Sequence, residues 1–533
     1  MKKRNFKTSV LLLLGFSIVF SSCLKYPNLK PTNDVTSETV YSTPAGYKQV
    51  LAKVYGAFAL TGNQGPAGNG DVQGIDEGFS DFFRLYWKAQ ELSTDEAVIA
   101  WGDIGIQDFH NMNWSANNPF LTGLYYRCMY QITLCNEFIR QSSDANLAKR
   151  GISGSDADNI RQYAREAQFL RAYQYWVLMD LFGNPPFVTE NSAIGGTPPP
   201  QASRSQIFSY IEDQLKQIEP NMPATNEYGR ANKAVVWALL ARLYLNAEVY
   251  TGTAHYADAL TYSKKVIDLP NYSLLSNYRW LMLADNNVNN PEFIFTINYD
   301  GLKTTGYGGT TFLTHAEVGG SMPSSNFGVG GGWAGIRATK NLVNLFPDAN
   351  GSTDKRAQFY SSGQNLEIAN QTDFTQGYAV TKYRNVKRDG SMGQSQDFSD
   401  IDMPLFRLAE MYLIYAEAAL RTNSAPDIAN ALTYINKLRG RAYANDPSST
   451  TGNISQSQLT LDFILDERGR ELYWEGFRRT DLVRYKKFVE SSYLWPWKGG
   501  VSGGTGVAPY LALYPIPSRD INANTNLKQN PGY

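Results

Sequence analysis

The sequence predicts a mostly α-helical protein, in which a tetratricopeptide-like helical repeat scaffold supports an irregular, loop-rich ligand-binding half. Two helix-pair units, at residues 230–270 and 405–438, predict the scaffold because their apolar residues recur at helical spacing. Residues 301–335 predict the loops, since they hold 11 glycines interleaved with aromatic residues. The 533-residue chain is long enough to bury a large core.

The first 22 residues have the pattern of a signal peptide. Their charge is entirely basic, at Lys2, Lys3, Arg4 and Lys7. The apolar run at residues 10–20 is shorter than the roughly 20 residues that span a bilayer. Ser21 and Ser22 precede Cys23 and resemble a bacterial lipobox, which would make Cys23 the acylated first residue of the mature protein; the alternative is an ordinary signal peptide with an incidental cysteine.

Residues 23–43 are rich in proline, asparagine and threonine and are interpreted as a lipidated tether. Without residues 1–22 the chain has 45 basic and 49 acidic residues, a net charge of −4. This balance argues against a nucleic-acid partner and against a polybasic membrane patch. We therefore expect the membrane to be reached through the lipid anchor.

Residues 44–533 are expected to form a single unit. A first helix is predicted near residues 44–60, and the chain is then loop-rich over residues 61–118. Helical spacing resumes at 120–141 and at 156–182, and the helix at 203–218 begins with a capping box of Ser203 and Gln206.

Small residues line one face of the helix that opens the unit at 230–270. They are Ala231, Ala234, Ala238 and Ala241. Small side chains let a partner helix approach closely, while bulky residues fill the gaps between neighbours. The order Trp237, Leu240, Ala241, Tyr244 and then Ala259 follows the tetratricopeptide template.

The unit at 405–438 repeats this pattern, and Ser424 with Asp427 predicts a capping box for its second helix. Since such units stack at least three deep, we assign the scaffold mainly to residues 120–270 and 402–490. Loop-rich binding regions are expected at about 61–118, 271–401 and 491–533. Cys128 and Cys135 lie about 10 Å apart along one predicted helix, too far for a disulfide, and are expected to be buried thiols.

Catalysis by paired carboxylates is disfavoured. Four acids crowd one segment, at Asp466, Glu467, Glu471 and Glu475. A glycosidase needs two carboxyls about 5 to 9.5 Å apart across a cleft, whereas these share one helix with several arginines. We interpret them as an ion-pair lattice, with Glu467 on Arg470 and Arg468 on Glu471.

Other sequence patterns that could indicate a catalytic or metal site lack the residues that such a site needs. Residues 500–504 match G-x-S-x-G, but no histidine follows the serine, since the last of the three histidines is His315. The histidines are too scattered for a zinc site. Asp348, Asn350 and Asp354 are spaced oxygen ligands that depart from an EF-hand loop. We expect no cofactor; bound calcium is the one metal left open.

Ligand binding remains as the function of the loops. Sugar rings pack their C–H faces on tryptophan and tyrosine, and their hydroxyls need a few fixed polar partners. Candidate ligand-binding residues from the loop-rich stretches are Trp101, Tyr307, Phe327, Trp333, Asp71 and Arg84. Trp101 suits either a ligand platform or a local core, and Trp333 also suits a structural role, since it precedes an expected helix at 339–346.

Five stretches in order carry a resemblance to a known family. They are Ser22-Cys23 with the tether, EAQFLRAY (166–173) with LFGNPP (181–186), LFRLAEMYLIYAEA (405–418), ILDERGRELYWEGFRR (464–479), and LYPIP (513–517) through NPGY (530–533). Along nearly its whole length the sequence resembles the SusD/RagB family of outer-membrane nutrient-binding lipoproteins. Two departures are Thr525, where proline is common, and the absence of an acidic run after Cys23.

The resemblance implies a tetratricopeptide-like scaffold with a loop-rich ligand site, lipid-anchored in the outer membrane and facing outward. It also implies a partner, a TonB-dependent transporter of the SusC type. The expected function is capture of a glycan and its delivery to that transporter, without catalysis. Two alternatives stay open: a peptide or other nutrient as ligand, and a surface glycoside hydrolase.

Overall fold

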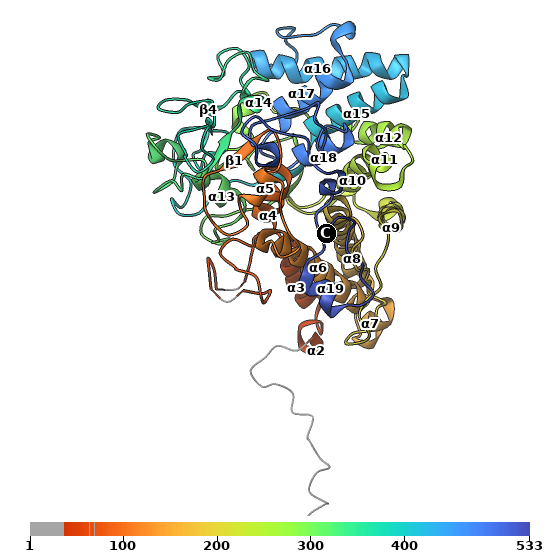
Figure 1. Cartoon of the computed structure of the whole chain (residues 1–533). Helices are drawn as coiled ribbons and strands as arrows, with labels where there is room; N and C mark the ends of the chain where they lie inside the picture. Colours follow the sequence, from red (N-terminus) through yellow and green to blue (C-terminus); the bar gives the residue numbers. More distant parts are fainter. Residues whose placement is uncertain (1–36, 63, 69) are drawn as a thin grey trace, which may run out of the picture.

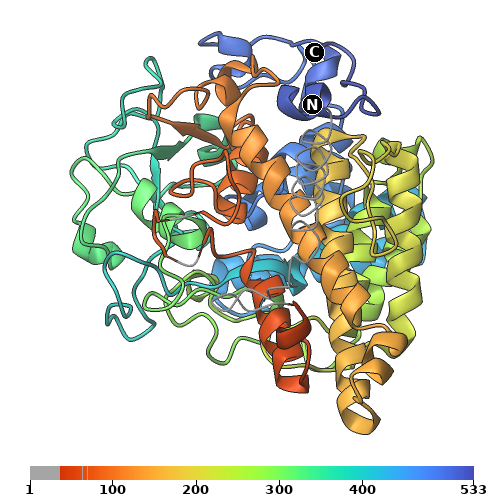
Figure 2. The same ribbon diagram turned by 90° about the horizontal axis from the view of Figure 1, so that it is seen from below.

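The structure is a computed structural model that describes residues 37–62, 64–68 and 70–533 (Figure 1). Cys23, the predicted signal peptide and most of the predicted tether lie outside the described residues. The fold is mostly helical, and Figures 1 and 2 show its two halves. Long helices gather on one side, and the loops of residues 270–400 gather on the other.

The scaffold consists of long helices joined by short ones. Its members are α6 (Pro119–Gln141), α7 (Asp144–Lys149), α8 (Gly154–Phe182), α9 (Arg204–Ile218), α10 (Lys233–Leu245), α11 (Ala247–Thr251), α12 (Tyr256–Ile267), α15 (Leu408–Thr422), α16 (Ala425–Ala444), α17 (Leu461–Leu472) and α18 (Arg478–Arg484). In order, α6 packs on α8, α8 on α9, α10 on α12, α12 on α15, and α15 on α16. The two predicted helix-pair units therefore stack directly on each other, although residues 268–407 separate them in the sequence.

The small residues of α10 lie where the sequence predicts them. Ala234, Ala238 and Ala241 are fully buried, as is the larger Tyr244. Trp237 is only half-buried, and its Nε1 donates to a Glu219 oxygen at 2.7 Å. The alanine face thus allows close helix packing, while Trp237 covers the edge of the stack.

Capping was predicted at the start of two scaffold helices. Ser203 and Gln206 form the predicted capping box at the start of α9. The second prediction is wrong: Ser424 is the N-cap residue of α16, but its side chain makes no capping hydrogen bond to the backbone. Asp427 instead accepts a hydrogen bond from the Tyr415 hydroxyl at 2.6 Å. A tertiary contact therefore replaces the local one.

The loop-rich half is held by three small antiparallel sheets, which pair β1 with β3, β2 with β6, and β4 with β5. The strands are β1 (Ala97–Ile99), β2 (Phe293–Ile297), β3 (Ile336–Ala338), β4 (Phe359–Tyr360), β5 (Ala379–Val380) and β6 (Met403–Arg407). The helices outside the scaffold are α2 (Ser37–Val40), α3 (Pro44–Gly56), α4 (Phe82–Glu91), α5 (Asp108–Asn111), α13 (Gly309–Ala316), α14 (Lys340–Val343) and α19 (Ser518–Ala523). Short 3₁₀ turns are η1 (Glu219–Asn221), η2 (Tyr278–Trp280), η3 (Ser324–Phe327), η4 (Gln456–Gln458), η5 (Lys498–Gly500) and η6 (Pro509–Ala512).

Three elements differ from the sequence prediction. The first long helix, α3, ends at Gly56, and α14 is shorter than the helix expected at residues 339–346. The helix α4 lies inside a stretch predicted as loops. A short apolar stripe is present at Phe82, Leu85 and Ala89, but the helix has only ten residues and follows a glycine-rich stretch.

A buried ion-pair lattice joins the two halves. Glu471 of α17 contacts Arg356, Arg407 and Arg441, with N–O distances of 3.2, 2.6 and 2.6 Å. The predicted pair of Glu467 and Arg470 is present at 2.7 Å. The predicted pair of Arg468 and Glu471 is wrong, because Arg468 contacts Asp481 at 2.7 Å.

Two further expectations concern the core and the membrane. Cys128 and Cys135 are free, buried thiols, as predicted. Over the residues that the structure describes, no helix combines the length and the apolar character needed to cross a bilayer.

Candidate functional site

A buried arginine on α4 organises the candidate site. The helix begins after Asp81, whose side chain accepts the backbone N–H of Arg84 at 2.9 Å. The Nη1 of Arg84 donates to the carbonyl of Tyr307 at 2.7 Å and to that of Gly78 at 3.2 Å. Its guanidinium lies 4.8 Å from the ring centroid of Phe312. Although burial lowers the pKa of Arg84 to about 10, this cation stays charged at neutral pH.

Trp101 is fixed beside this arginine by the small sheet of β1 and β3. The indole Nε1 donates to the carbonyl of Trp333 at 2.9 Å. Gln107 donates to the Trp101 carbonyl at 2.7 Å and so holds the chain just beyond β1. A Cβ on Gly335 would lie 2.7 Å from the Trp101 ring, so glycine is needed for the close approach of the two segments.

Trp333 sits at the centre of the arrangement. Its backbone N–H donates to the His315 carbonyl at 2.8 Å, and its ring stacks on the His315 imidazole with centroids 4.7 Å apart. The Trp101 ring lies 6.3 Å from it at 46°, and the Tyr307 ring lies 6.1 Å from it at 75°. The Arg84 guanidinium is 5.6 Å from the Trp101 ring and 5.9 Å from the Trp333 ring.

We call Arg84, Trp101, Tyr307 and Trp333 the aromatic platform. Tyr307 is 37% exposed, and the two tryptophans are half-buried. Since each ring is turned relative to the next, the platform is curved. The arginine lies 5.6 and 5.9 Å from the two tryptophan rings and donates to the backbone of Tyr307.

The other two candidate residues lie elsewhere. Phe327 is 5% exposed in a small core with Val318, Met322, Val329, Phe374 and Ala379. Its ring has no free face, and we do not include it in the platform. Asp71 is exposed, and one of its oxygens pairs with Arg127 at 2.5 Å.

Two residues that contact the platform were not predicted as site residues. Phe398 packs beside Tyr307 with ring centroids 6.0 Å apart, and His315 supports Trp333 from below. Neither belongs to a local motif. Phe398 is 91 residues from Tyr307 in the chain, so this pairing arises only in the folded structure.

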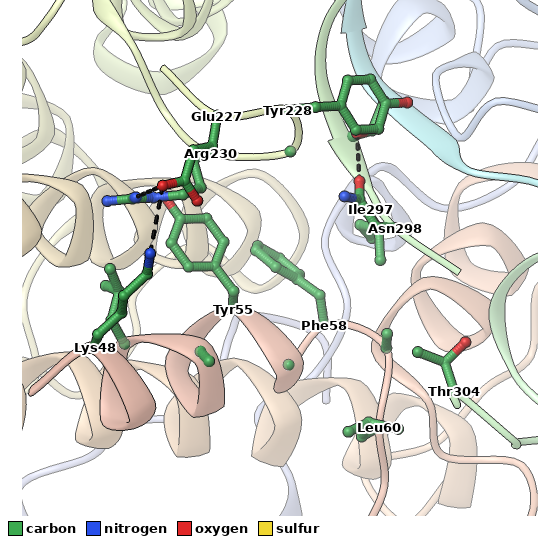
Figure 3. A pocket seen from close by; sticks show the side chains of 16 residues that line it. Lys48, Tyr55, Phe58, Leu60, Glu227, Tyr228, Arg230, Ile297, Asn298 and Thr304 are labelled. Atoms are coloured by element: carbon green, nitrogen blue, oxygen red, sulfur yellow. Dashed lines mark hydrogen bonds and ion pairs between the residues drawn. The ribbon is translucent and has the colours of Figure 1, made fainter. Parts of the chain in front are cut away.

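A hollow of about 360 Å³ lies beside α3 (Figure 3). We call it the α3 hollow; its lining comes from α3, residues 227–230, the end of β2, and Thr304. Glu227 at its rim lies 3.4 Å from Lys48 and 3.3 Å from Arg230. Arg230 also pairs with buried Glu166 at 2.6 Å. The sequence analysis made no prediction for this hollow.

Most of the carboxylates that the sequence analysis considered for catalysis or metal binding form ion pairs with arginines of the protein. Although burial raises the pKa of Glu471, the guanidinium groups of Arg441, Arg407 and Arg356 lower it to about 2. Such a carboxyl stays ionised at neutral pH and has no proton to donate. Asp354 pairs with Arg356 at 2.7 Å. No group of three or more metal-ligating side chains occurs at residues 37–62, 64–68 and 70–533.

Comparison with known proteins finds relatives of this chain, and one of them matches it over its full length. The sequence model of the SusD family matches residues 356–533. The chain is 35% identical to the "Starch-binding protein SusD" of Bacteroides thetaiotaomicron, over 100% of this chain and 99% of that protein. It is 27% identical to the "SusD-like protein P2" of Formosa agariphila, over 73% of this chain and 77% of that protein.

Solved structures share the fold. A SusD-like carbohydrate-binding protein from Bacteroides fragilis matches with a TM-score of 0.70 at 19% identity, over 92% of this chain and 100% of that one. Surface glycan-binding protein A from Bacteroides thetaiotaomicron, in complex with laminarihexaose, matches with a TM-score of 0.68 at 20% identity, over 91% of this chain and 99% of that one.

Proposed function

We propose, from the premise that this chain belongs to the SusD family, that it captures a glycan on the aromatic platform. Members of this family are binding proteins, and the chain is not an enzyme. The observation that supports this proposal most strongly is that Arg84 and Trp101 meet Tyr307 and Trp333, although residues 84–101 and 307–333 are distant in the sequence. Sugar rings stack on such aromatic faces, and fixed polar groups beside them orient the hydroxyls.

An α-linked glucan is the glycan that we propose. One supporting observation is the name of the full-length relative, a starch-binding protein. The other is the tilt of the rings, 46° and 75° between neighbours, which makes the platform curved. Chains of α-1,4-linked glucose curve, whereas chains of β-1,4-linked glucose are straight.

We further propose that Cys23 anchors the protein in the outer membrane, facing outward, and that a SusC-like TonB-dependent transporter receives the glycan. The lipobox-like Ser21-Ser22-Cys23 supports the anchor. Family membership supports the partner. The polar tether at residues 23–43 would leave the platform free to meet a polymer outside the cell.

Calorimetry with purified protein tests the ligand class. Malto-oligosaccharides are titrated beside cello-oligosaccharides, which are β-1,4-linked, and a set of short peptides. The proposal expects heat of binding from malto-oligosaccharides and little from the other two. Binding of peptides alone would favour the alternative nutrient ligand, and release of reducing ends from any polysaccharide would favour a hydrolase.

A further inference from the structure

The α3 hollow and the aromatic platform are joined by one short stretch of chain. Thr304 lines the hollow, and Tyr307 belongs to the platform. Three residues of extended chain span at most about 11 Å, so the two Cα atoms lie within that distance. A second link is Phe58 of the hollow, which packs on Phe82 of α4 with ring centroids 5.2 Å apart. Elements that line the hollow therefore lie close to elements that carry the platform.

The chemistry of the α3 hollow suits a sugar. Tyr228 is 47% exposed, and its hydroxyl donates to an Asp402 oxygen at 2.8 Å, which fixes the ring while leaving a face open. Asn298 lies next to Tyr228 in Figure 3, and its Oδ1 accepts the Thr296 hydroxyl at 2.6 Å. Over the part of the chain that the structure describes, nothing accepts a hydrogen bond from its amide nitrogen. A fixed aromatic ring beside a free amide donor is what a sugar ring and its hydroxyls require.

The charges at the rim argue for a neutral ligand. Lys48 and Arg230 both contact Glu227, and Arg230 also contacts Glu166. Two cations are thus matched by two carboxylates. Among the described residues that line the hollow, no unpaired charge is left to attract an anion or a cation. The floor beneath includes the apolar side chains of Leu51 and Ile297.

We propose that the α3 hollow is a second subsite for the same glycan, holding sugar units that extend past Tyr307 from the platform. This inference rests on the proposed function, since the platform must first hold one part of the chain. A glycan long enough to reach both the platform and the hollow gains binding free energy from its contacts in each. Affinity should therefore rise with oligosaccharide length until both are filled.

Two variants alter the hollow in opposite ways, one by removing a lining ring and the other by adding one. Tyr228→Ala removes the exposed ring. Ala52→Trp adds a bulky ring at an exposed position of α3 that lines both this hollow and a neighbouring one of about 480 Å³. Tyr510→Ala is the matched control, since Tyr510 is a 40% exposed tyrosine that does not line the hollow.

Calorimetry with malto-oligosaccharides from three to about ten units tests the subsite on the full mature chain. For the parent and for Tyr510→Ala we expect affinity to rise with length. For both hollow variants we expect unchanged affinity for the shortest ligand that binds, and a loss of roughly fivefold to tenfold for the longest, by analogy with one lost stacking contact. Circular dichroism melts verify that each variant is folded.

The outcomes separate the two claims. If the parent binds long and short oligosaccharides equally, or if both hollow variants retain the full gain with length, the second subsite is wrong while the platform stands. If the parent binds no glycan of any length, the proposed function itself fails.

Discussion

The Nη1 of Arg84 donates to the backbone carbonyl of Tyr307 at 2.7 Å, across 223 residues of sequence. Gly306 and Gly308 flank this tyrosine, so the loop has little conformational preference of its own. The arginine supplies the missing constraint, because it is buried and anchored on α4. A helix of the fold thus holds an exposed aromatic ring in a fixed place.

Replacing this arginine should weaken glycan binding by more than the loss of one contact. Arg84→Met removes the hydrogen bond to Tyr307 and the cation beside Trp101 and Trp333. Arg84→Lys should not restore affinity, because the lysine side chain is one bond shorter than the position from which Nη1 contacts both carbonyls. It also lacks the planar group that lies beside the tryptophan rings. Calorimetry measures both variants. Parent-like affinity in Arg84→Met would show that the loop holds its place without the arginine.

Overpacking the helical stack should destabilise the scaffold. Ala241 is fully buried on α10, so Ala241→Leu must push a neighbouring helix away and should cost about 1–3 kcal/mol of unfolding free energy. Ala429→Leu is the control, because Ala429 is exposed on α16. Urea denaturation compares the stability of the two variants. Equal midpoints would mean that the space around Ala241 accommodates a leucine without displacing the neighbouring helix.

Stability should fall as the pH rises through neutrality. Burial raises the pKa of Glu91 to about 7, and burial together with the Glu91 charge raises the pKa of Glu96 well above its ordinary value. Carboxyls with raised pKa values contribute stability below their unfolded pKa, near 4.5, and lose it as pH rises through the folded value. We expect a lower melting temperature at about pH 8 than at about pH 6.

The variant Glu96→Gln tests the source of this dependence. An amide cannot ionise but keeps the shape of the protonated acid, so the difference in melting temperature between the two pH values should shrink. The buried Glu471 serves as contrast, because its low pKa leaves its charge unchanged over this range. An identical pH profile in the parent and in Glu96→Gln would assign the effect to other groups.

Anchoring should depend on Cys23. Cys23→Ser removes the thiol that a lipid would modify, and we expect the variant to be released from the outer membrane or left unprocessed. Membrane fractionation with metabolic lipid labelling measures this. Retention of both label and membrane association in the variant would show that the anchor lies elsewhere.

The scaffold was predictable from sequence because its information is local. In α10, Ala234, Ala238 and Ala241 repeat at helical spacing, and the structure places the helix at Lys233–Leu245. By contrast, α4 was missed although Phe82, Leu85 and Ala89 lie on one stripe, because the helix has only ten residues and follows a glycine-rich stretch. The small sheets were missed because strands of two to five residues, such as β1, pair only with distant partners.

The site was predictable in part. Glycine-rich context marked Tyr307 and Trp333 as loop residues, and the structure brings them together with Trp101 and Arg84. The same context could not distinguish Phe327, which the fold buries. Loop aromatics that pack a small core and those that face solvent have the same local composition, and only tertiary contacts separate them.

Replacing Trp101 tests the platform most directly. Calorimetry of Trp101→Ala against a malto-oligosaccharide should give a loss of about 1–3 kcal/mol in binding free energy, by analogy with bases stacked on aromatic side chains. Trp237→Ala, in the helical stack, should lower the melting temperature more than Trp101→Ala does, and bind the glycan like the parent. Parent-like affinity in Trp101→Ala, or a loss of affinity matched by Trp237→Ala, would contradict the account.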